Sequence, residues 1–235
     1  DTLKIGNISD RGFVIDRQLT LMPLDNTSKI SNGFIHLVKG SDGSTVSGLT
    51  INNTKGALSI NGIYVGQLHG IWITKSNNNT IVNNTIRIAN AAGVYAMPMG
   101  WSSYNRIIGN DMSTYITCVM VMGQCHYNII SKNKLETLDY NDFIVSNLIY
   151  FNPFGHADYG GSPLCLGNVI SDNYLKAFCN GAMSIVLQLV YENHINTTIA
   201  NNTIIRGSYG ISLYSDNATV YNNTIIESSI SVSAM

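Results

Sequence analysis

The segment between residues 137 and 161 carries the side chains best suited to chemistry. It brings together acidic residues, a histidine and a tyrosine, in a chain of which only 11% is charged: Asp139, Asp142, His156, Asp158 and Tyr159. Carboxylates beside a histidine can transfer protons, and carboxylate oxygens can bind a calcium ion. The alternative is structural, because Asp, Asn, Gly and Pro are ordinary turn-forming residues. The residue types alone leave both interpretations open.

A row of large side chains is the second candidate site. Four-residue segments such as 70–73, 93–96 and 118–121 predict strands whose second and fourth residues face the core and whose third faces outward. Four outward residues would lie side by side: Trp72, Tyr95, Met120 and Tyr150. Flat rings in a row can stack on sugars, but an apolar strip can also be covered by a loop or another subunit, which we favour. His36, His69, His126 and His194 have no ligand spacing and are interpreted as surface or loop residues.

A recurring octad predicts the elements that position these side chains. Six copies have asparagine in the sixth place, with an apolar residue three positions before it and another two positions after it. The asparagines are Asn84, Asn110, Asn133, Asn173, Asn202 and Asn223. Their successive spacings of 26, 23, 40, 29 and 21 residues are typical of a solenoid, and the longest coil contains the ionisable cluster of residues 137–161.

Stacked coils would bring the asparagines into contact. If each octad belongs to one turn of a parallel β-coil, equivalent residues lie about 4.8 Å apart and their amides can form a hydrogen-bonded ladder. We therefore predict an all-β solenoid of about seven to eight coils in a single domain, residues 1–235. Residues 1–43 would form an N-terminal coil or entry region, and residues 44–230 the regular coils, beginning with a degenerate octad in which Leu49 replaces the asparagine.

Two cysteines occupy one place in adjacent predicted coils. Cys125 and Cys165 each lie eight residues before a ladder asparagine, so their separation of about one strand spacing would permit a disulfide. Buried reduced thiols are the alternative. A bridge would imply an oxidising, extracytoplasmic setting.

Three Asn-X-Thr sequons arise because the octad contains Asn-Asn-Thr. Their asparagines, Asn83, Asn201 and Asn222, precede the ladder positions and should point outward. Glycosylation at these positions would require a secreted protein; otherwise the sequons are by-products of the repeat.

Composition excludes several classes of function. The net charge is −1 and no Lys/Arg cluster is present, which excludes a phosphate-binding nucleic-acid surface. No apolar run approaches the roughly 20 residues of a membrane-spanning helix, and no signal peptide is visible. Because the chain starts at Asp1 in structured-looking sequence, we interpret it as a mature or trimmed product. No motif predicts a metal or other cofactor.

The octads, together with the segments 17–23 (RQLTLMP) and 37–54 (LVKGSDGSTVSGLTINNT), resemble the right-handed parallel β-helix of the pectin-lyase-like superfamily. The resemblance covers residues 13 to 230 and is nearest to the NosD-like branch and to adhesin-like surface proteins of archaea and bacteria. It implies the fold, but the superfamily includes lyases, hydrolases, epimerases and non-catalytic surface proteins. The sets of catalytic residues found in its polygalacturonase-like and pectate-lyase-like members have no counterpart here, apart from a partial match to one motif at Gly155–Asp158.

We therefore expect a non-catalytic structural or adhesive segment of an extracellular cell-surface protein. Its expected partners are other protein at the ends of the coil stack, through further coils or self-association, and cell-surface glycans. The alternative is a polysaccharide-acting lyase, hydrolase or epimerase that uses the loops of residues 137–161, with calcium as an optional cofactor.

Overall fold

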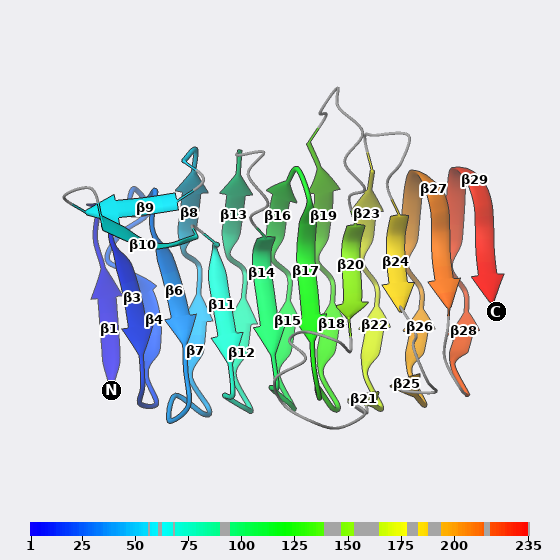
Figure 1. Ribbon diagram of the computed structural model, residues 1–235, viewed down its shortest axis with the longest axis horizontal. Coiled ribbons are helices and arrows are strands. Elements are labelled where there is room, and N and C mark those ends of the chain that lie inside the picture. Colours follow the sequence, from blue (N-terminus) through cyan, green and yellow to red (C-terminus); the bar gives the residue numbers. More distant parts are fainter. Residues whose placement is uncertain are drawn as a thin grey trace.

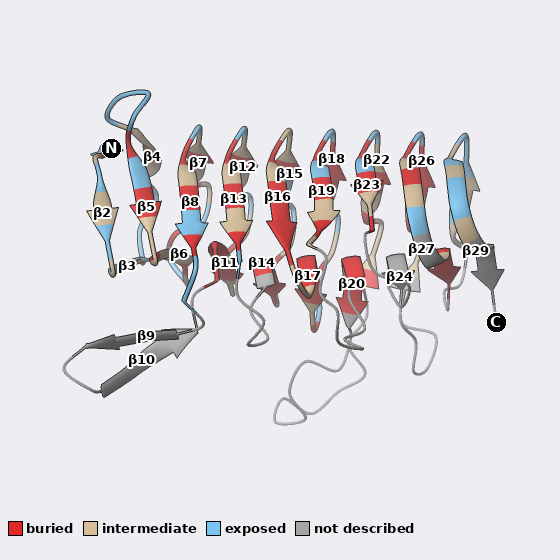
Figure 2. Cartoon of the chain, turned by 90° about the horizontal axis from the view of Figure 1, so that it is seen from above, coloured by how far each residue is buried: buried red, intermediate tan, exposed pale blue. Residues whose placement is uncertain are grey.

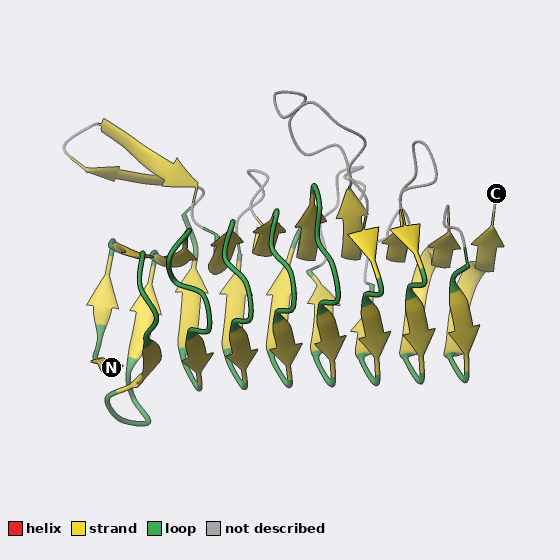
Figure 3. Cartoon of the chain, turned by 90° about the horizontal axis from the view of Figure 1, so that it is seen from below, coloured by secondary structure: helices red, strands yellow, loops and turns green. Residues whose placement is uncertain are grey.

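In the computed structural model the chain is a right-handed parallel β-helix in which three parallel sheets surround a single core (Figure 1). The structure describes residues 1–55, 57–60, 63–67, 69–89, 95–138, 147–152, 165–177, 183–187, 194–213 and 217–234. All regular elements in these ranges are strands (Figure 3). The described part of the chain contains no helix with the length and hydrophobicity needed to cross a bilayer.

The first sheet contains one short strand from each coil. In spatial order its nine strands are β1 (Thr2–Ile5), β4 (Thr20–Pro23), β7 (Thr45–Ser47), β12 (Thr80–Val82), β15 (Arg106–Ile108), β18 (Ile129–Ser131), β22 (Val169–Ser171), β26 (Thr198–Ala200) and β28 (Thr219–Tyr221). The described residues thus form nine coils where seven to eight were expected. The difference arises because residues 1–43, expected as an N-terminal coil or entry region, form two coils, β1–β3 and β4–β6.

The second sheet follows the first after a sharp bend in each coil. Its strands are β2 (Ile8–Ser9), β5 (Lys29–Ser31), β8 (Thr50–Asn53), β13 (Thr85–Ile88), β16 (Asp111–Thr114), β19 (Lys134–Thr137), β23 (Tyr174–Lys176) and the first parts of β27 (Thr203–Leu213) and β29 (Thr224–Ala234). Each octad therefore consists of a first-sheet strand, the bend, and the start of a second-sheet strand.

The third sheet closes the coil. It contains β3 (Gly12–Ile15), β6 (Phe34–Leu37), β11 (Ile71–Thr74), β14 (Tyr95–Gly100), β17 (Thr117–Met122), β20 (Asn147–Asn152), β24 (Met183–Leu187) and the later parts of β27 and β29. Two short additions interrupt the regular pattern: the antiparallel hairpin of β9 (Ala57–Ile60) and β10 (Ile63–Gln67), and the pair β21 (Cys165–Leu166) and β25 (His194–Ile195).

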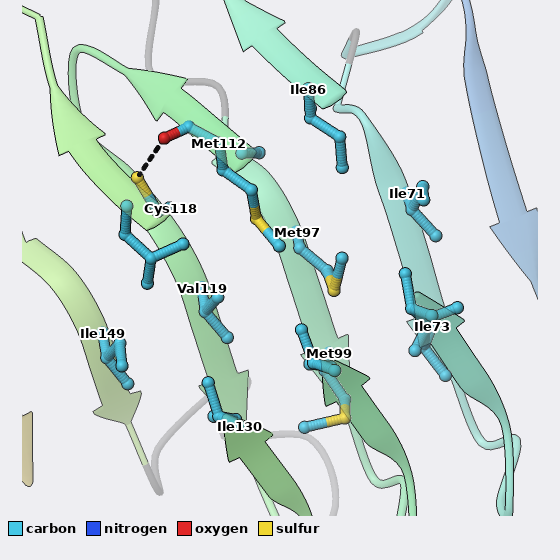
Figure 4. Packing of buried hydrophobic residues seen from close by; sticks show 14 of the residues in the cluster. Ile71, Ile73, Ile86, Met97, Met99, Met112, Cys118, Val119, Ile130 and Ile149 are labelled. Carbon is cyan, nitrogen blue, oxygen red and sulfur yellow. Dashed lines mark hydrogen bonds between the residues drawn. The ribbon is translucent and has the colours of Figure 1, made fainter. Parts of the chain in front are cut away.

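The core is built from buried apolar residues of all three sheets, and buried positions recur from one coil to the next (Figure 2). The octad supplies two columns, and its first apolar position is fully buried at Ile81, Ile107, Ile130, Ile170 and Ile199. The third sheet adds pairs such as Ile71 and Ile73, Met97 and Met99, which pack against the neighbouring coils (Figure 4). Because aliphatic side chains repeat at each level, one hydrophobic cluster extends from Ile5 to Leu213.

Candidate functional site

The predicted asparagine ladder is confirmed and forms the first bend of the coils. Each side-chain Nδ2 donates to the Oδ1 of the asparagine in the next coil, at 2.9–3.0 Å from Asn84 through to Asn223. The same oxygen also accepts the backbone N–H of the preceding asparagine, and Nδ2 donates to a carbonyl of the previous coil, as from Asn133 to Ile107. The ladder stops at Leu49 because leucine has no side-chain amide. The backbone N–H of Leu49 still donates to Asn84 Oδ1 at 3.0 Å.

The residue before each ladder asparagine adopts a left-handed backbone. Its φ is 54° at Asn83, 56° at Asn201 and 53° at Asn222, and glycine, lysine or aspartate takes the same position in other coils. Asparagine tolerates this conformation better than most residues with a Cβ. The two residues of the octad's Asn-Asn pair are therefore required for different reasons: the first for its left-handed backbone and the second for the ladder. All three sequon asparagines are exposed, as predicted.

A second buried ladder escaped the sequence analysis. It lies at the other bend, where Nδ2 of one asparagine donates to Oδ1 of the asparagine in the next coil at 3.0–3.2 Å, in the order Asn79, Asn105, Asn128 and Asn168. Ser44 joins it through its N–H, which donates to Asn79 Oδ1. The signal was present in the sequence, because asparagine takes the first place in four of the six octads.

A third, half-exposed chain of polar contacts runs beside the second ladder. The N–H of Asn77 donates to Asp42 Oδ1, and the N–H of Ser103 donates to Asn77 Oδ1. In the following coils the N–H of His126 donates to Ser103 Oγ, and the N–H of Leu166 donates to His126 Nδ1. His126 is thus held by its neighbours above and below, and partial burial lowers its pKa. His126 lies in a loop, as expected, but contacts with both neighbouring coils fix its position.

Exposed aromatic rings lie along the turn next to this polar chain. The rings of Tyr104 and Tyr127 are stacked, with centroids 5.2 Å apart and an interplanar angle of 21°. Tyr127 covers Gly167, where an added Cβ would lie 2.5 Å from the ring, and Trp101 covers Gly123 in the same way at 2.6 Å. The strand pattern did not predict this group, because its residues lie in turns.

A stacked histidine and tryptophan lie on the outer face of the third sheet. The rings of His36 and Trp72 are 4.1 Å apart and nearly parallel, and His69 meets Trp72 edge-on at 5.2 Å. His36 Nε2 lies 3.1 Å from Thr74 Oγ1, and burial lowers the pKa of His36 to about 4. His69 is only 5% exposed. His36 is thus a surface residue that is half-buried, and His69 is a loop residue that is buried.

The predicted aromatic row needs one correction. Strand pairing places Trp72 next to Pro98, and Pro98 is paired with Met120, which is paired with Tyr150. Tyr95 is paired with Thr117 instead, so it is not part of the row. The sequence alignment was out of register because Met97 and Met99 are paired with Val119 and Val121, where Val94 and Ala96 were expected. Ala96 is buried as expected, and the shift was missed because a proline inside a strand argues against that assignment.

The corrected row is not a continuous open surface. Met120 is 6% exposed and Pro98 is also buried, whereas Trp72 and Tyr150 are half-buried. A stacking surface that extends from Trp72 to Tyr150 is therefore interrupted by buried side chains.

Charged residues on the outer face of the second sheet bind one another. Arg87 donates to Asp111 Oδ2 at 2.6 Å and to the Asp111 carbonyl at 2.8 Å, and Lys134 lies 3.3 Å from Glu136. Among the described residues, no group of three or more His, Cys, Asp or Glu side chains could hold a metal ion. The predicted catalytic candidates Asp139, Asp142, His156, Asp158 and Tyr159 lie outside the described residues.

Cys125 and Cys165 occupy adjacent coils but are not bridged. Both thiols are free and buried, and they continue a column whose earlier members include Ser76 and Ser102. Ser102 N–H donates to Cys125 Sγ at 3.4 Å, while Cys165 Sγ donates to the Gly123 carbonyl at 3.2 Å. Burial raises the pKa of Cys165 to about 11 and raises that of Cys125 further, so neither thiol forms a reactive thiolate near neutral pH.

Solved structures of the same architecture cover almost the whole chain. An alginate lyase from Paenibacillus sp. matches with a TM-score of 0.54 and 11% identity over 92% of this chain and 75% of that chain. A pectin methylesterase from Yersinia enterocolitica matches with a TM-score of 0.51 and 9% identity over 94% of this chain and 86% of that chain. No protein-family model and no curated protein sequence matches this chain.

At these identities the similarity concerns the fold alone. The right-handed parallel β-helix that the octads led us to expect is thereby confirmed as an architecture. The narrower resemblance to NosD-like and adhesin-like proteins stays a prediction. The same scaffold carries enzymes in both neighbours, so the function of this chain has to be argued from its own residues.

Proposed function

We propose that the chain is a rigid, non-catalytic structural and adhesive segment of an extracellular surface protein. The observation that carries this proposal is the pair of buried amide ladders, which run through successive coils in one register. In each interior ladder asparagine the Oδ1 accepts two hydrogen bonds and the Nδ2 donates two, as at Asn133. Polar groups that are fully satisfied in a core make its conformation specific and rigid.

The outer surface supports the same proposal. The charged side chains of the second sheet form ion pairs with each other, including Arg87 with Asp111 and Lys134 with Glu136. Exposed pairs of this kind add little stability, but they leave a surface without unpaired charge at these positions. Such a surface suits a scaffold that carries its contacts elsewhere, at its turns and at its ends.

The ends of the coil stack are the proposed contacts with other protein. Val220 and Ile225 in the last coil are partly exposed, whereas their equivalents in the preceding coil, Ile199 and Ile204, are fully buried. Another coil of the same kind would bury these side chains and pair with β28 and β29. Such a coil can come from the same polypeptide or from a neighbouring subunit, because the geometry required is identical.

Turnover assays test the non-catalytic part of this proposal. The chain is incubated with alginate, polygalacturonate and methylated pectin, with and without calcium, and unsaturated ends, reducing ends and methanol are measured. We expect no product with any polymer. Product formation that depends on protein concentration would contradict the proposal.

Light scattering across a concentration series tests the contacts at the ends. We expect association that grows with concentration and is weakened by Val220→Asp, which places a charge on the last coil. The control is Tyr174→Asp, since Tyr174 is 36% exposed in β23, an interior strand that is paired on both sides with β19 and β27 and lies away from the proposed contact. A monomer at all concentrations would count against end-to-end contact.

A polysaccharide-acting enzyme is the second candidate. It is favoured by the long coil, because Asn133 bonds directly to Asn173 although 40 residues separate them in the sequence. The ladder thus accommodates an insertion that contains Asp142 and His156 without losing its register. If turnover is found, Asp142→Asn or His156→Ala should abolish it while leaving the melting temperature nearly unchanged.

A further inference from the structure

Three aromatic residues adopt a backbone conformation that aromatic residues rarely take. The φ values are 49° at Trp101, 60° at Tyr104 and 53° at Tyr127, all in the left-handed region. For a bulky side chain this conformation is a genuine outlier, and such outliers concentrate at sites of function. The three residues lie in turns of two adjacent coils, which points to one shared cause.

The turn itself does not require an aromatic residue. The positions equivalent to Tyr104 and Tyr127 in other coils have the same left-handed backbone and are held by smaller residues: Gly43, Asn78, Gly167, Asn196 and Asn217. Glycine and asparagine adopt this conformation with less strain. The ring of each tyrosine therefore has to be explained by what it contacts.

Contacts within the chain hold the rings flat but do not bury them. Tyr104 stacks on Tyr127, which in turn lies over Gly167, and yet Tyr104 is 54% exposed and Tyr127 47% exposed. These contacts leave about half of each tyrosine exposed, which is more than packing within the chain requires. Here the turn presents an ordered aromatic surface to solvent, with two phenol hydroxyls at its margin.

A neutral hydrogen-bond donor lies beside the surface. The His126 ring centroid is 6.4 Å from that of Tyr127, and His126 Nδ1 accepts the N–H of Leu166 at 3.1 Å. Because Nδ1 acts as acceptor, the proton of the neutral imidazole is on Nε2, where it can be donated to a ligand.

We infer that Tyr104 and Tyr127, flanked by Trp101 and His126, form a glycan-binding strip that stacks on the face of a hexopyranose ring. A pyranose has an apolar C–H face and a polar rim, and the tyrosine pair offers an apolar face with polar groups at its edge. This inference rests on the proposed adhesive function and names its ligand class. A nucleic acid is the poorer match, because its phosphates require clustered cations and the chain has a net charge of −1.

The local charge sets the range of sugars to be tested. The segments 101–109 and 123–132 contain Arg106 and Lys132 but no carboxylate. Neither a neutral hexose nor a uronate would be repelled there, so both types of polymer belong in the experiment.

Affinity electrophoresis in native gels tests the strip directly. The 235-residue chain is run in gels that contain galactomannan, a soluble β-glucan or polygalacturonate, each at graded concentrations. We expect wild type to be retarded by at least one polymer. The double variant Tyr104→Asn, Tyr127→Asn should bind that polymer at least tenfold more weakly, while its melting temperature is equal to or above that of wild type. Asparagine is the residue of equivalent turns, and the change leaves net charge unaltered.

Two further variants sharpen the result. Tyr174→Asn is the matched control, because Tyr174 is 36% exposed in β23, a second-sheet strand of an interior coil, and its retardation should equal that of wild type. Tyr127→Phe keeps the stacking face and should keep most of the retardation, which provides a result even if the double variant is poorly folded.

The outcomes separate this inference from the proposed function. Absence of retardation in all three polymers, or unchanged retardation of a folded double variant, would overturn the strip but leave the rigid structural segment intact. Loss of retardation in Tyr174→Asn would equally assign binding to another surface. Release of reducing or unsaturated ends from the polymers would instead contradict the non-catalytic function, whatever the tyrosine variants do.

Discussion

At the residue scale, asparagine has two distinct roles in each bend. One residue, such as Asn83, adopts the left-handed backbone and is exposed, while the next, Asn84, points inward and joins the ladder. The first role can be filled by glycine, lysine or aspartate, as at Gly109, Lys132 and Asp172. The second needs a side chain that both donates and accepts, which explains why the ladder column is the stricter of the two.

Asn133→Leu should therefore destabilise the chain by about 1–3 kcal/mol, because donors of Asn110 and the Ile107 carbonyl lose their partners in a buried site. Lys132→Gly is the control. Lys132 is exposed and has a left-handed backbone with φ of 56°, which glycine adopts without strain, so this change should be neutral or slightly stabilising. Urea unfolding of the three proteins measures both effects. An equal loss of stability in both variants would disprove the distinction between the two asparagine roles.

His36 should make stability depend on pH. Its pKa is lowered to about 4 in the folded chain against 6.5 for an ordinary histidine, because burial disfavours the charged ring. The unfolded chain thus binds a proton below pH 6.5 that the folded chain does not, so the contribution to stability is present above that pH and falls as pH drops towards 4. The pKa of His126 is also lowered by burial, so His126 contributes to stability in the same direction.

Thermal melts between pH 7 and pH 4 measure this dependence. His36→Phe keeps a flat ring against Trp72 but cannot titrate, so its melting temperature should fall less over this range than that of wild type. Tryptophan fluorescence should report the same transition, because the rings of His36 and Trp72 are 4.1 Å apart. Parallel pH curves for the two proteins would argue against a contribution from His36.

At the element scale, β14 shows how strand register depends on neighbouring coils. Pairing with β11 and β17 places Met97 and Met99 in the core and Pro98 outward. Methionine suits this position because its flexible, unbranched side chain fills irregular gaps. The sequence alignment, which expected a strand at residues 93–96, had no means of weighing these contacts.

Met99→Ala should destabilise the chain by about 2–5 kcal/mol, as expected for truncation of a fully buried side chain. Val14→Ala is the comparison, since Val14 is 61% exposed and should cost little. The midpoints of denaturant unfolding, compared at constant m-value, give the loss of unfolding free energy for each variant. A small effect of Met99→Ala would favour the register first expected from the sequence.

At the scale of the whole molecule, the solenoid makes stability a sum of contacts between neighbouring coils. Each interior coil is covered on both sides, whereas the last coil contacts only the one before it. Equivalent residues should consequently have different energetic importance along the stack.

Ile204→Ala and Ile225→Ala test this expectation with one substitution at equivalent places in β27 and β29. Ile204 is fully buried and Ile225 only partly, so the first variant should lose more stability, by about 1 kcal/mol or more. The difference should shrink at protein concentrations where end-to-end association occurs. Equal losses at low concentration would mean that the last coil is already covered.

The sequence by itself determined the architecture of this protein. A polar residue that recurs between apolar residues at solenoid spacing has few solutions other than stacked parallel coils with an internal amide ladder, and both are present. It also determined the exposed sequon asparagines and the neighbouring places of Cys125 and Cys165, because these positions follow from counting residues within one coil.

Only the tertiary structure decided how side chains meet across coils. His36 and Trp72 stack although 36 residues separate them. Tyr104 and Tyr127 each precede an octad, so counting places them in adjacent coils, but the stacking of their rings depends on the left-handed backbone of both turns. Such contacts depend on the register between coils of unequal length and on left-handed turns that residue spacing does not encode. The physical reason is that the octad specifies how a coil bends, whereas the surface depends on how each coil is placed on the next.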